Sequence, residues 1–418
     1  FCLLPSNFCL LSSSHPHLTQ NNGSLYIEGV DANALADQYG TPLYVYSKNR
    51  ILNNYRRLKA AFKKSGVPIN IHYAIKANNN LAILHSLREL GAGADASCFN
   101  EIELARHAGF PPEKIINSGN NNTDEDLIHA LKHVDKINLD DITILPRLLK
   151  FGKPKILSFR LNPMVGSGSH GTNVFGGKES KFGIDAETAL YAYQIAQKRG
   201  IKRFGIHMMP GTGGLDPDAY PNATRILIET MEMIAEKTGI QFEFMNIGGG
   251  FGIPYRDGVA PLDMDAIAQK IAKLYKEAIK KNEERLRLAE KTTGPQLTLA
   301  CEPGRYIVGD AGILLARVHT VKKAHKKFAG TDAGMNVMMR PALHGSYHRV
   351  LCANKMADTQ EKIRYTLCGP ICENGDQYPE PYDLPPLEER DLLAILDTGA
   401  YGYSMANNYN TQSRPAEV

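Results

Sequence analysis

The sequence predicts an α/β protein, in which a (β/α)8 TIM-like barrel is followed by a C-terminal all-β domain. Two observations predict the barrel. From about residue 41, short β-rich stretches alternate with helical ones, and polar groups stand where those stretches end. After about residue 305, strand-like segments are separated by turn residues with almost no helical pattern, which predicts the second domain. A doubly wound open sheet is the alternative for the first domain.

The expected barrel strands are short β-rich runs, and each is followed by a segment with apolar residues at helical spacing. Eight or nine such units occur without a break in composition, which fits a closed barrel. The strands are expected at residues 42–46, 69–75, 93–97, 114–119, 137–140, 155–162, 203–209, 242–250 and 297–304. In the second domain, strand-like segments are 305–324, 336–344, 365–376 and 391–402.

The ends of these regions define the expected organisation. The first 27 residues contain no Asp, Glu, Lys or Arg, so residues 1–24 are expected to be a disordered lead-in or a cloning scar. A transit peptide, and with it a plastid location, is the minority interpretation. Residues 25–40 are expected to pack on the β-domain, 41–305 to form the barrel and 306–418 the β-domain. The chain stops at "NTQSRPAEV", and the β-domain is expected to be truncated there.

Composition excludes several classes of function. With 418 residues, 43% hydrophobic and 22% charged, the chain is an ordinary globular protein with room for two domains. The net charge of +4 and a basic run without aromatics, "KKAHKK", do not indicate nucleic-acid binding. No apolar run is long enough to cross a membrane. Seven cysteines lack the paired spacing of a zinc site, so free thiols, a cytoplasmic location and no metal are expected.

Polar groups gather at the expected carboxyl ends of the barrel strands, where barrel active sites lie. Each has an ordinary explanation by itself: a solvated lysine, a tight glycine loop, or a turn with an ion pair. Their convergence on one rim makes a shared site the better interpretation. The residues are Lys76, Asp95, Asn120, His207, Met209, Gly248–Gly250, Glu302 and Arg305.

These groups together meet the needs of one cofactor. Lys76 is flanked by Ile75 and Ala77, and a desolvated lysine has a lowered pKa that favours Schiff-base chemistry. Consecutive glycines expose backbone N–H groups to an anion such as a phosphate. A buried carboxylate keeps a pyridinium nitrogen protonated. Amine, anion cradle and carboxylate together indicate pyridoxal 5'-phosphate.

The motifs resemble those of the diaminopimelate decarboxylases, which are fold-type III, alanine-racemase-like pyridoxal-phosphate enzymes. The resemblance runs from about residue 25 to the C-terminus. It implies a homodimer with shared active sites that converts meso-2,6-diaminopimelate to L-lysine and CO2, the last step of lysine biosynthesis. The motifs are "YAIKAN", "GADASCFNEIELA", "SGNNNT", "SKFGI", "NIGGGFG", "CEPGRYIV", "RPALHGSYH", "GPICENGD" and "GAYGYSMANNYN".

The resemblance also implies residue roles. Lys76 would link to the cofactor, Glu302 would hold the ring nitrogen, and Cys372 would act near the reacting carbon. Asp95 and Glu101 fall on acidic positions near the lysine, and Cys372 and Glu373 would come from the partner subunit. The cofactor would contact Lys76, Asp95, His207, Thr212, Gly249, Gly250, Glu302, Gly304, Arg305 and Tyr401. The substrate would contact Arg305, Arg340, His344, Glu373 and Tyr401.

Substrate choice follows from charge, because Arg340 with Arg305 suits a distal carboxylate. The chain departs from the family at Met209, where a histidine is usual, at His344, where a tyrosine is usual, and at Asn122, where a lysine is usual. Because of Met209 and His344, a pyridoxal-phosphate decarboxylase of ornithine, lysine or arginine is the first alternative. A catalytically silent homologue that binds the cofactor is the second, although Lys76 and Cys372 are both present.

Overall fold

The computed structural model describes residues 14–164, 167–168, 177, 180–288, 296–358 and 360–418. The chain divides into two compact units. The barrel unit holds residues 54–253 and 261–306, and the β unit holds residues up to 53, 254–260 and 307–418. In the described part of the chain, no helix combines the length and the apolar character that crossing a bilayer requires.

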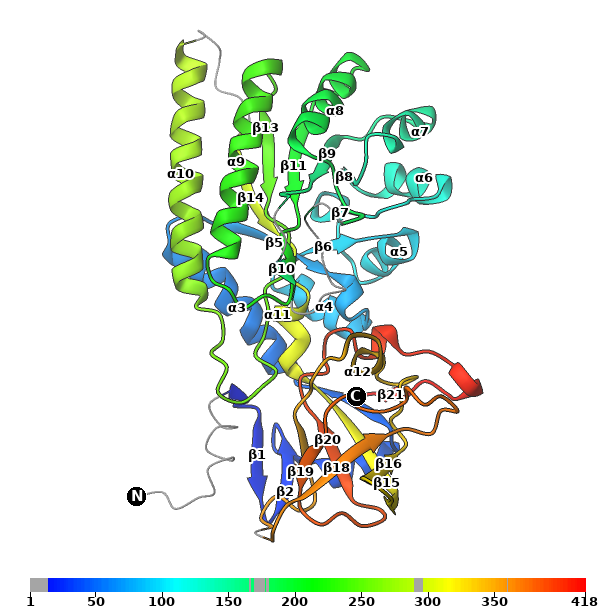
Figure 1. The fold of residues 1–418 in the computed structure, drawn as a ribbon. Helices are drawn as coiled ribbons and strands as arrows, with labels where there is room; N and C mark the ends of the chain where they lie inside the picture. Colours follow the sequence, from blue (N-terminus) through cyan, green and yellow to red (C-terminus); the bar gives the residue numbers. More distant parts are fainter. Residues whose placement is uncertain (1–13, 165–166, 169–176, 178–179, 289–295, 359) are drawn as a thin grey trace. The chain divides into compact units, whose positions relative to one another are not determined.

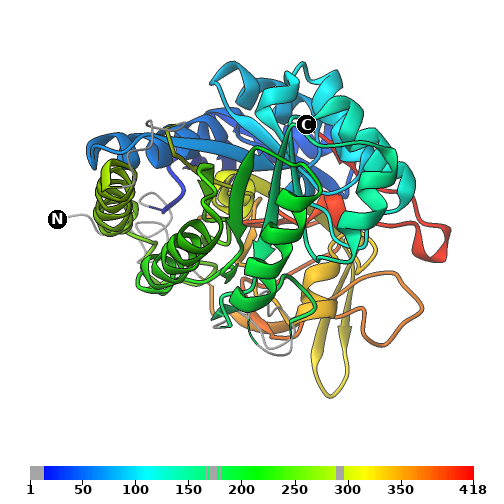
Figure 2. The ribbon, with the colours of Figure 1, turned by 90° about the horizontal axis from the view of Figure 1, so that it is seen from above.

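The barrel unit contains a closed ring of eight parallel strands, with helices around its outside (Figures 1 and 2). The ring confirms the predicted (β/α)8 barrel, so the open-sheet alternative is wrong. The order around the ring is β11-β13-β14-β5-β6-β7-β8-β9. The strands are β5 Ile69–Ala74, β6 Gly93–Ala96, β7 Ile115–Asn117, β8 Lys136–Leu139, β9 Ile156–Leu161, β11 Phe204–Met208, β13 Phe242–Asn246 and β14 Thr298–Cys301.

Helices shield the outer face of the ring, and every residue of β6 and β9 is consequently buried. Side-chain caps set several helix starts: Asn80, Thr123 and Asp185 each accept a hydrogen bond from a backbone N–H of the following turn. The helices are α3 Lys48–Lys64, α4 Leu81–Glu89, α5 Phe99–His107, α6 Asp124–His133, α7 Ile144–Phe151, α8 Ala186–Lys198, α9 Ala219–Thr238, α10 Met264–Leu288 and α11 Arg305–Val308. A short parallel pair, β10 Ser167–Gly168 and β12 Gly211–Thr212, is separate from the ring.

The β unit is built on a mixed sheet whose path is β17-β20-β15-β16-β18-β19. Apolar side chains form two cores within this unit, one including Leu314, Val318 and Leu367 and the other Ile313, Leu315 and Leu392. Neighbouring residues of β15 alternate between the two cores, as the period of a strand requires. The strands are β15 Gly312–Lys323, β16 Lys327–Thr331, β17 Val350–Cys352, β18 Ile363–Cys368, β19 Tyr382–Leu384, β20 Leu392–Ile395 and β21 Ala416–Glu417.

The assignment of residues 42–46 to the barrel as its first strand is wrong. Strand β4, Leu43–Tyr46, pairs antiparallel with β15 and parallel with β21, so it belongs to the sheet of the β unit. Tyr44 enters one core of that unit, and Leu43 and Val45 enter the other. A strand followed by a helix has the same sequence pattern in both settings, so the pattern alone could not separate them.

The expected disordered lead-in is also wrong for residues 14–24, while residues 1–13 lie outside the described part. β1 Leu18–Asn21 pairs with β2 Ser24–Ile27, which pairs with β3 Val30–Asp31. Nε2 of His15 lies 2.8 Å from Oδ1 of Asp397, and both side chains are buried. Leu18, Leu25 and Leu35, the last on helix α2 Ala32–Tyr39, share a core with β15 and β20.

The segment 336–344 was expected to be a strand, yet it contains helix α12, Met339–His344. Pro341 stands in the first turn, where the missing N–H costs no hydrogen bond. Gly345 ends the helix in a left-handed conformation with φ of 61°. Arg340 is therefore presented by a helix.

Candidate active site

Lys76 lies just beyond the carboxyl end of β5, in the 3-10 turn Ile75–Ala77. Its Nζ forms an ion pair with Oδ2 of Asp95, which lies on the adjacent strand β6. The flanking Ile75 and Ala77 are fully buried, as expected, but the side chain of Lys76 is 41% exposed. The expected desolvation of the amine is therefore wrong for this structure: Asp95 and solvent both reach it.

Glu302 follows β14, the neighbour of β5 in the ring, and is held on both carboxylate oxygens. Nε2 of His207 lies 3.0 Å from Oε2, and Nδ2 of Asn246 donates to Oε1 over 2.7 Å. Burial works to raise the pKa of Glu302, but attraction to His207 and Lys76 outweighs it and lowers the pKa to about 2. Glu302 is thus a buried carboxylate that stays ionised.

Asp95 shows the opposite behaviour. It is fully buried, and burial together with repulsion from Glu302 raises its pKa to about 7, against the lowering influence of Lys76. Two nearby carboxyl groups with pKa values driven apart are typical of sites that carry out acid–base chemistry. The predicted residues Lys76, Asp95, His207 and Glu302 are therefore one electrostatically coupled group.

The turns that carry Lys76 and Glu302 also contact each other directly. The N–H of Ala74 donates to the carbonyl oxygen of Pro303 over 3.4 Å. A Cβ on Gly304 would lie 2.7 Å from the Cβ of Ala77, so only glycine allows this approach. Arg305, which begins α11, is buried beside this turn.

The glycine loop after β13 packs closely on the turn that carries Glu302. The carbonyl oxygen of Gly248 accepts a hydrogen bond from the N–H of Glu302 over 2.8 Å. A Cβ on Gly249 would lie 2.1 Å from the carbonyl oxygen of Glu302, so no other residue fits. The N–H of Gly249 donates to Sδ of Met209, at 3.1 Å. A thioether is a weak hydrogen-bond acceptor, so the N–H of Gly249 can donate to an anionic acceptor instead.

Sequence reasoning missed Arg160, which lies inside strand β9, and Asn246, which is the last residue of β13. Arg160 is buried, with its guanidinium 4.5 Å from the ring centre of Phe182 and Nη1 3.7 Å from Oδ1 of Asp140. Burial lowers the pKa of Arg160, and the charges of Asp140, Glu302 and Asp95 oppose this. An arginine within the apolar run "ILSFRL" was the signal that could have revealed it.

These residues fit pyridoxal phosphate. The barrel unit offers an amine on Lys76, an ionised carboxylate on Glu302, and glycine amides with the buried hydroxyl of Thr212 nearby on β12. Among the described residues, three buried polar atoms of this group have no hydrogen-bond partner: Oδ1 of Asp95, Nη2 of Arg160 and Nδ1 of His207. Buried polar atoms are normally satisfied, so their presence indicates a site for a polar ligand. Glu101 has another use, because its Oε2 accepts the N–H of Ser97.

The remaining predicted residues belong to the β unit, where Arg340 is the most elaborately held. The buried guanidinium donates from Nη1 to the hydroxyl of Tyr255 over 3.1 Å and from Nη2 to Oγ of Ser346 over 3.4 Å. Nη1 also lies 2.8 Å from Nε2 of His348, whose Nδ1 lies 2.9 Å from the carbonyl oxygen of Leu396. The ring of Tyr255 stacks under it at 4.9 Å.

His344 and Tyr401 are both partly buried. His344 is the last residue of α12, on the same short helix as Arg340. Tyr401 has a φ of 57°, a left-handed conformation that a bulky residue rarely adopts. Such backbone strain clusters at functional positions, which agrees with the predicted role of Tyr401.

Cys372 and Glu373 are exposed on a loop that is anchored by Asp376, a residue that sequence reasoning missed. Oδ2 of Asp376 accepts the N–H of Ile371 over 2.8 Å, and Oδ1 accepts the N–H of Met335 over 2.5 Å. Asp376 is buried, while the residues before it project outward. The motif "CENGD" thus presents a thiol and a carboxylate on a fixed loop.

Comparisons with known proteins identify the family. Residues 48–309 match the model of the pyridoxal binding domain of pyridoxal-dependent decarboxylases. The diaminopimelate decarboxylase of Methanothermobacter thermautotrophicus is 43% identical, over 95% of this chain and 91% of that protein. The diaminopimelate decarboxylase of M. jannaschii in complex with L-lysine has a TM-score of 0.85 and 34% identity, over 97% of this chain and 93% of that one.

A lysine/ornithine decarboxylase from Vibrio vulnificus shares the fold, with a TM-score of 0.76 and 24% identity over 92% of this chain and 96% of that one. The matched domain agrees with the amine, carboxylate and glycine loop of the barrel unit, and pyridoxal 5'-phosphate is the cofactor of that domain. On this evidence of sequence and fold, the chain belongs to the diaminopimelate decarboxylase family of pyridoxal-dependent decarboxylases.

Proposed function

We propose that this chain decarboxylates meso-2,6-diaminopimelate to L-lysine and CO2 with pyridoxal 5'-phosphate as cofactor. The observation that carries the proposal is the pairing of an accessible amine on Lys76 with a buried, ionised Glu302 on the neighbouring strand end. The relatives named diaminopimelate decarboxylase support the choice of substrate.

The residues divide the chemistry among them. When bound, the cofactor supplies an electron sink next to the substrate's α-carbon. Lys76 would hold the cofactor, and the ionised Glu302 would keep the ring nitrogen protonated. His207 and Asn246 fix the Glu302 carboxylate before any charge develops, which is electrostatic preorganisation.

Decarboxylation leaves the α-carbon in need of a proton, and Cys372 and Lys76 are the candidate acids. Gly249, Gly250, Thr212, Gly304 and Arg305 are proposed to surround the cofactor phosphate. The N–H of Gly249 supports this role because its present acceptor is a thioether.

Arg340 is proposed to bind the distal carboxylate of the substrate, and Arg305, His344 and Tyr401 are proposed as further substrate contacts. A guanidinium can grip a carboxylate through two parallel hydrogen bonds. Tyr255, Ser346 and His348 hold its orientation through contacts to uncharged oxygen atoms and a ring nitrogen. This pre-orientation reduces the entropy that binding would otherwise cost.

We further propose a homodimer in which Cys372 and Glu373 of one subunit complete the site of the other. Both side chains are exposed in the single chain, and Asp376 anchors the loop that presents them. Mixing a Lys76→Ala variant with a Cys372→Ala variant tests this arrangement, because subunit exchange restores one intact site per mixed dimer. Recovered activity of about one quarter of wild type is expected, and no recovery would contradict shared sites.

The function itself is tested with purified holoenzyme. Release of CO2 is measured from meso-diaminopimelate, ornithine, lysine and arginine at equal concentration. We expect rapid release from meso-diaminopimelate, with L-lysine as the product, and much slower release from the others. Preference for ornithine or lysine would favour the ornithine-type decarboxylases, and release from none would favour a catalytically silent homologue.

A further inference from the structure

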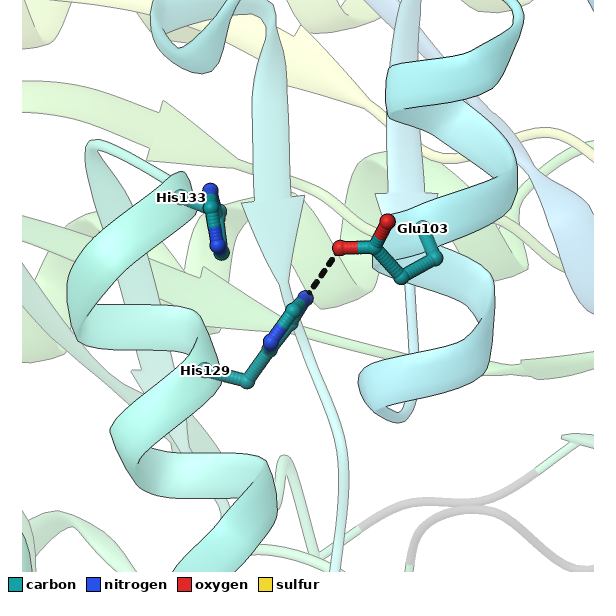
Figure 3. A group of neighbouring side chains, drawn as sticks. All are labelled: Glu103, His129 and His133. Carbon is teal, nitrogen blue, oxygen red and sulfur yellow. Dashed lines mark ion pairs between the residues drawn. The ribbon is translucent and has the colours of Figure 1, made fainter.

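We propose that Glu103, His129 and His133 form a binding site for a divalent transition-metal ion, with Zn²⁺ the best fit. The three side chains lie on helices α5 and α6, on the outside of the barrel and on elements other than the strand ends that carry Lys76 and Glu302 (Figure 3). The site is a further function of the chain and does not depend on the proposed decarboxylation.

Helix geometry brings the two histidines together. His129 and His133 are four residues apart on α6, so they share one face of the helix. Their rings lie 4.4 Å apart between centroids, at 45° to each other. Two histidines at this spacing are a known way for a helix to chelate zinc. The spacing is visible in "HALKH", but the sequence analysis considered zinc-ligand spacing for the cysteines alone.

Glu103 completes a set of three ligand atoms that converge. One nitrogen from each histidine and one oxygen from Glu103 all lie within 4.8 Å of one another. Ligands at zinc–nitrogen and zinc–oxygen distances near 2.1 Å are roughly 3.4 Å apart in a tetrahedron. Small side-chain rotations would reach that arrangement, which leaves a fourth position for water.

The closest pair in this set joins the two helices directly. Nε2 of His129 lies 2.6 Å from Oε1 of Glu103 in an ion pair, so these two ligand atoms already face each other. The ring of His129 packs edge-to-face against Phe99, at 4.9 Å between centroids. A divalent cation bound to both atoms would replace this ion pair.

One neighbouring cation competes for the carboxylate of Glu103. Nη1 of Arg106 lies 2.6 Å from Oε1 of Glu103, so the metal must share or displace this cation. His107 is not counted among the ligands, because its Nδ1 lies 2.8 Å from the backbone oxygen of Glu103.

A metal here would link α5 to α6. Helix α5 directly follows β6, the strand that carries Asp95. Two imidazoles and one carboxylate are ligands that zinc accepts, and imidazole also suits Co²⁺, Ni²⁺ and Cu²⁺. Binding to the folded protein alone would stabilise it, so saturating metal is expected to raise the Tm by a few degrees.

The experiment uses untagged holoenzyme and a metal-free buffer. Co²⁺ is added first because its visible absorption reports the ligands, and Zn²⁺ is then used to displace it. We expect one Co²⁺ per chain, with tetrahedral absorption and without the near-ultraviolet thiolate band that a cysteine ligand would give. His129→Gln and His133→Gln are expected to weaken binding at least about tenfold and to abolish the rise in Tm.

Two further variants complete the test. His85→Gln removes an exposed histidine paired with Glu89 on the neighbouring helix α4, and it is expected to bind metal as wild type does. Arg106→Gln removes the competing cation and is expected to bind metal more tightly. Equal binding by all variants, a thiolate band, or no binding by wild type would overturn the site. Arg106→Gln with unchanged affinity would remove Glu103 from the ligand set.

Discussion

The barrel rim and the β unit treat charge in different ways. At the rim, Lys76, Asp95 and Glu302 form a group in which opposite charges and burial shift the pKa of each carboxyl group strongly. In the β unit, Arg340 is oriented by Tyr255, Ser346 and His348. The difference fits the two proposed tasks, in which the rim residues set protonation states and Arg340 binds a carboxylate of the substrate.

Removing the amine at the rim should have the largest effect. Lys76→Ala is expected to lower kcat at least about 10³-fold, because the residue that holds the cofactor is lost. CO2 release measures this, and Lys64→Ala, which removes an exposed lysine paired with Asp265, is the matched control. Near-normal turnover by the Lys76→Ala enzyme would contradict the comparison, because the rim would then have no special chemical role.

Neutralising the carboxylate at the rim should come next. Glu302→Gln keeps the shape and an acceptor for Asn246 but loses the negative charge. We expect kcat to fall by about 10²- to 10³-fold, as when a preorganised electrostatic group is removed. KM should change little, because the group acts on the reacting centre. A change in KM alone would assign Glu302 to substrate binding instead.

Removing the guanidinium in the β unit should affect recognition and spare the cofactor. Arg340→Ala is expected to raise KM for meso-diaminopimelate about 100-fold, the worth of a charge-assisted hydrogen-bond pair. Cofactor absorbance should stay intact. Arg364→Ala, which removes an exposed arginine on β18, is the control. If the Arg340→Ala variant lost cofactor while the molecules that kept it had a normal KM, Arg340 would serve cofactor binding instead of substrate binding.

The smallest expected effect is on the pH dependence of stability. The pKa of Asp95 is raised from 3.8 to about 7 in the folded chain. Its contribution to the free energy of unfolding is therefore complete below pH 3.8 and is lost as pH rises through 7. The lowered pKa of Glu302, about 2 against 4.5, gives a contribution that is complete above pH 4.5 and is lost as pH falls towards 2. Between pH 4.5 and 7, the change in unfolding free energy with pH is therefore due mainly to Asp95.

Urea unfolding of cofactor-free protein measures this window. Wild type is expected to lose up to a few kcal/mol of unfolding free energy between pH 4.5 and 8. Asp95→Asn should show a flatter profile because it cannot ionise. Parallel profiles for the two proteins would show that Asp95 titrates normally.

Sequence reasoning located charged residues that follow apolar runs and missed two polar residues that belong to such runs. Lys76 and Glu302 were found because a charged residue after an apolar run marks the rim of a barrel. Arg160 and Asn246 were missed because each looks like a single polar interruption of a strand. Only the closed ring shows that Asn246 reaches Glu302.

The fold was predicted in class and misjudged at three segments, which are residues 14–24, 42–46 and 336–344. Residues 43–46 have the pattern of a barrel strand, and their partner, β15, lies more than 260 residues later. Long-range pairing of this kind leaves no local signal. The segment with Arg340 is helical because Pro341 fits a first turn, a fit that its apolar composition concealed.

One measurement tests the central claim, that the cofactor is held by Lys76 at the rim beside Glu302. The holoenzyme is treated with borohydride, which reduces a Schiff base to a stable bond, and its peptides are analysed by mass spectrometry. We predict the pyridoxyl phosphate mass on Lys76. A label on another lysine, or no label on a protein that contains the cofactor, would contradict the account.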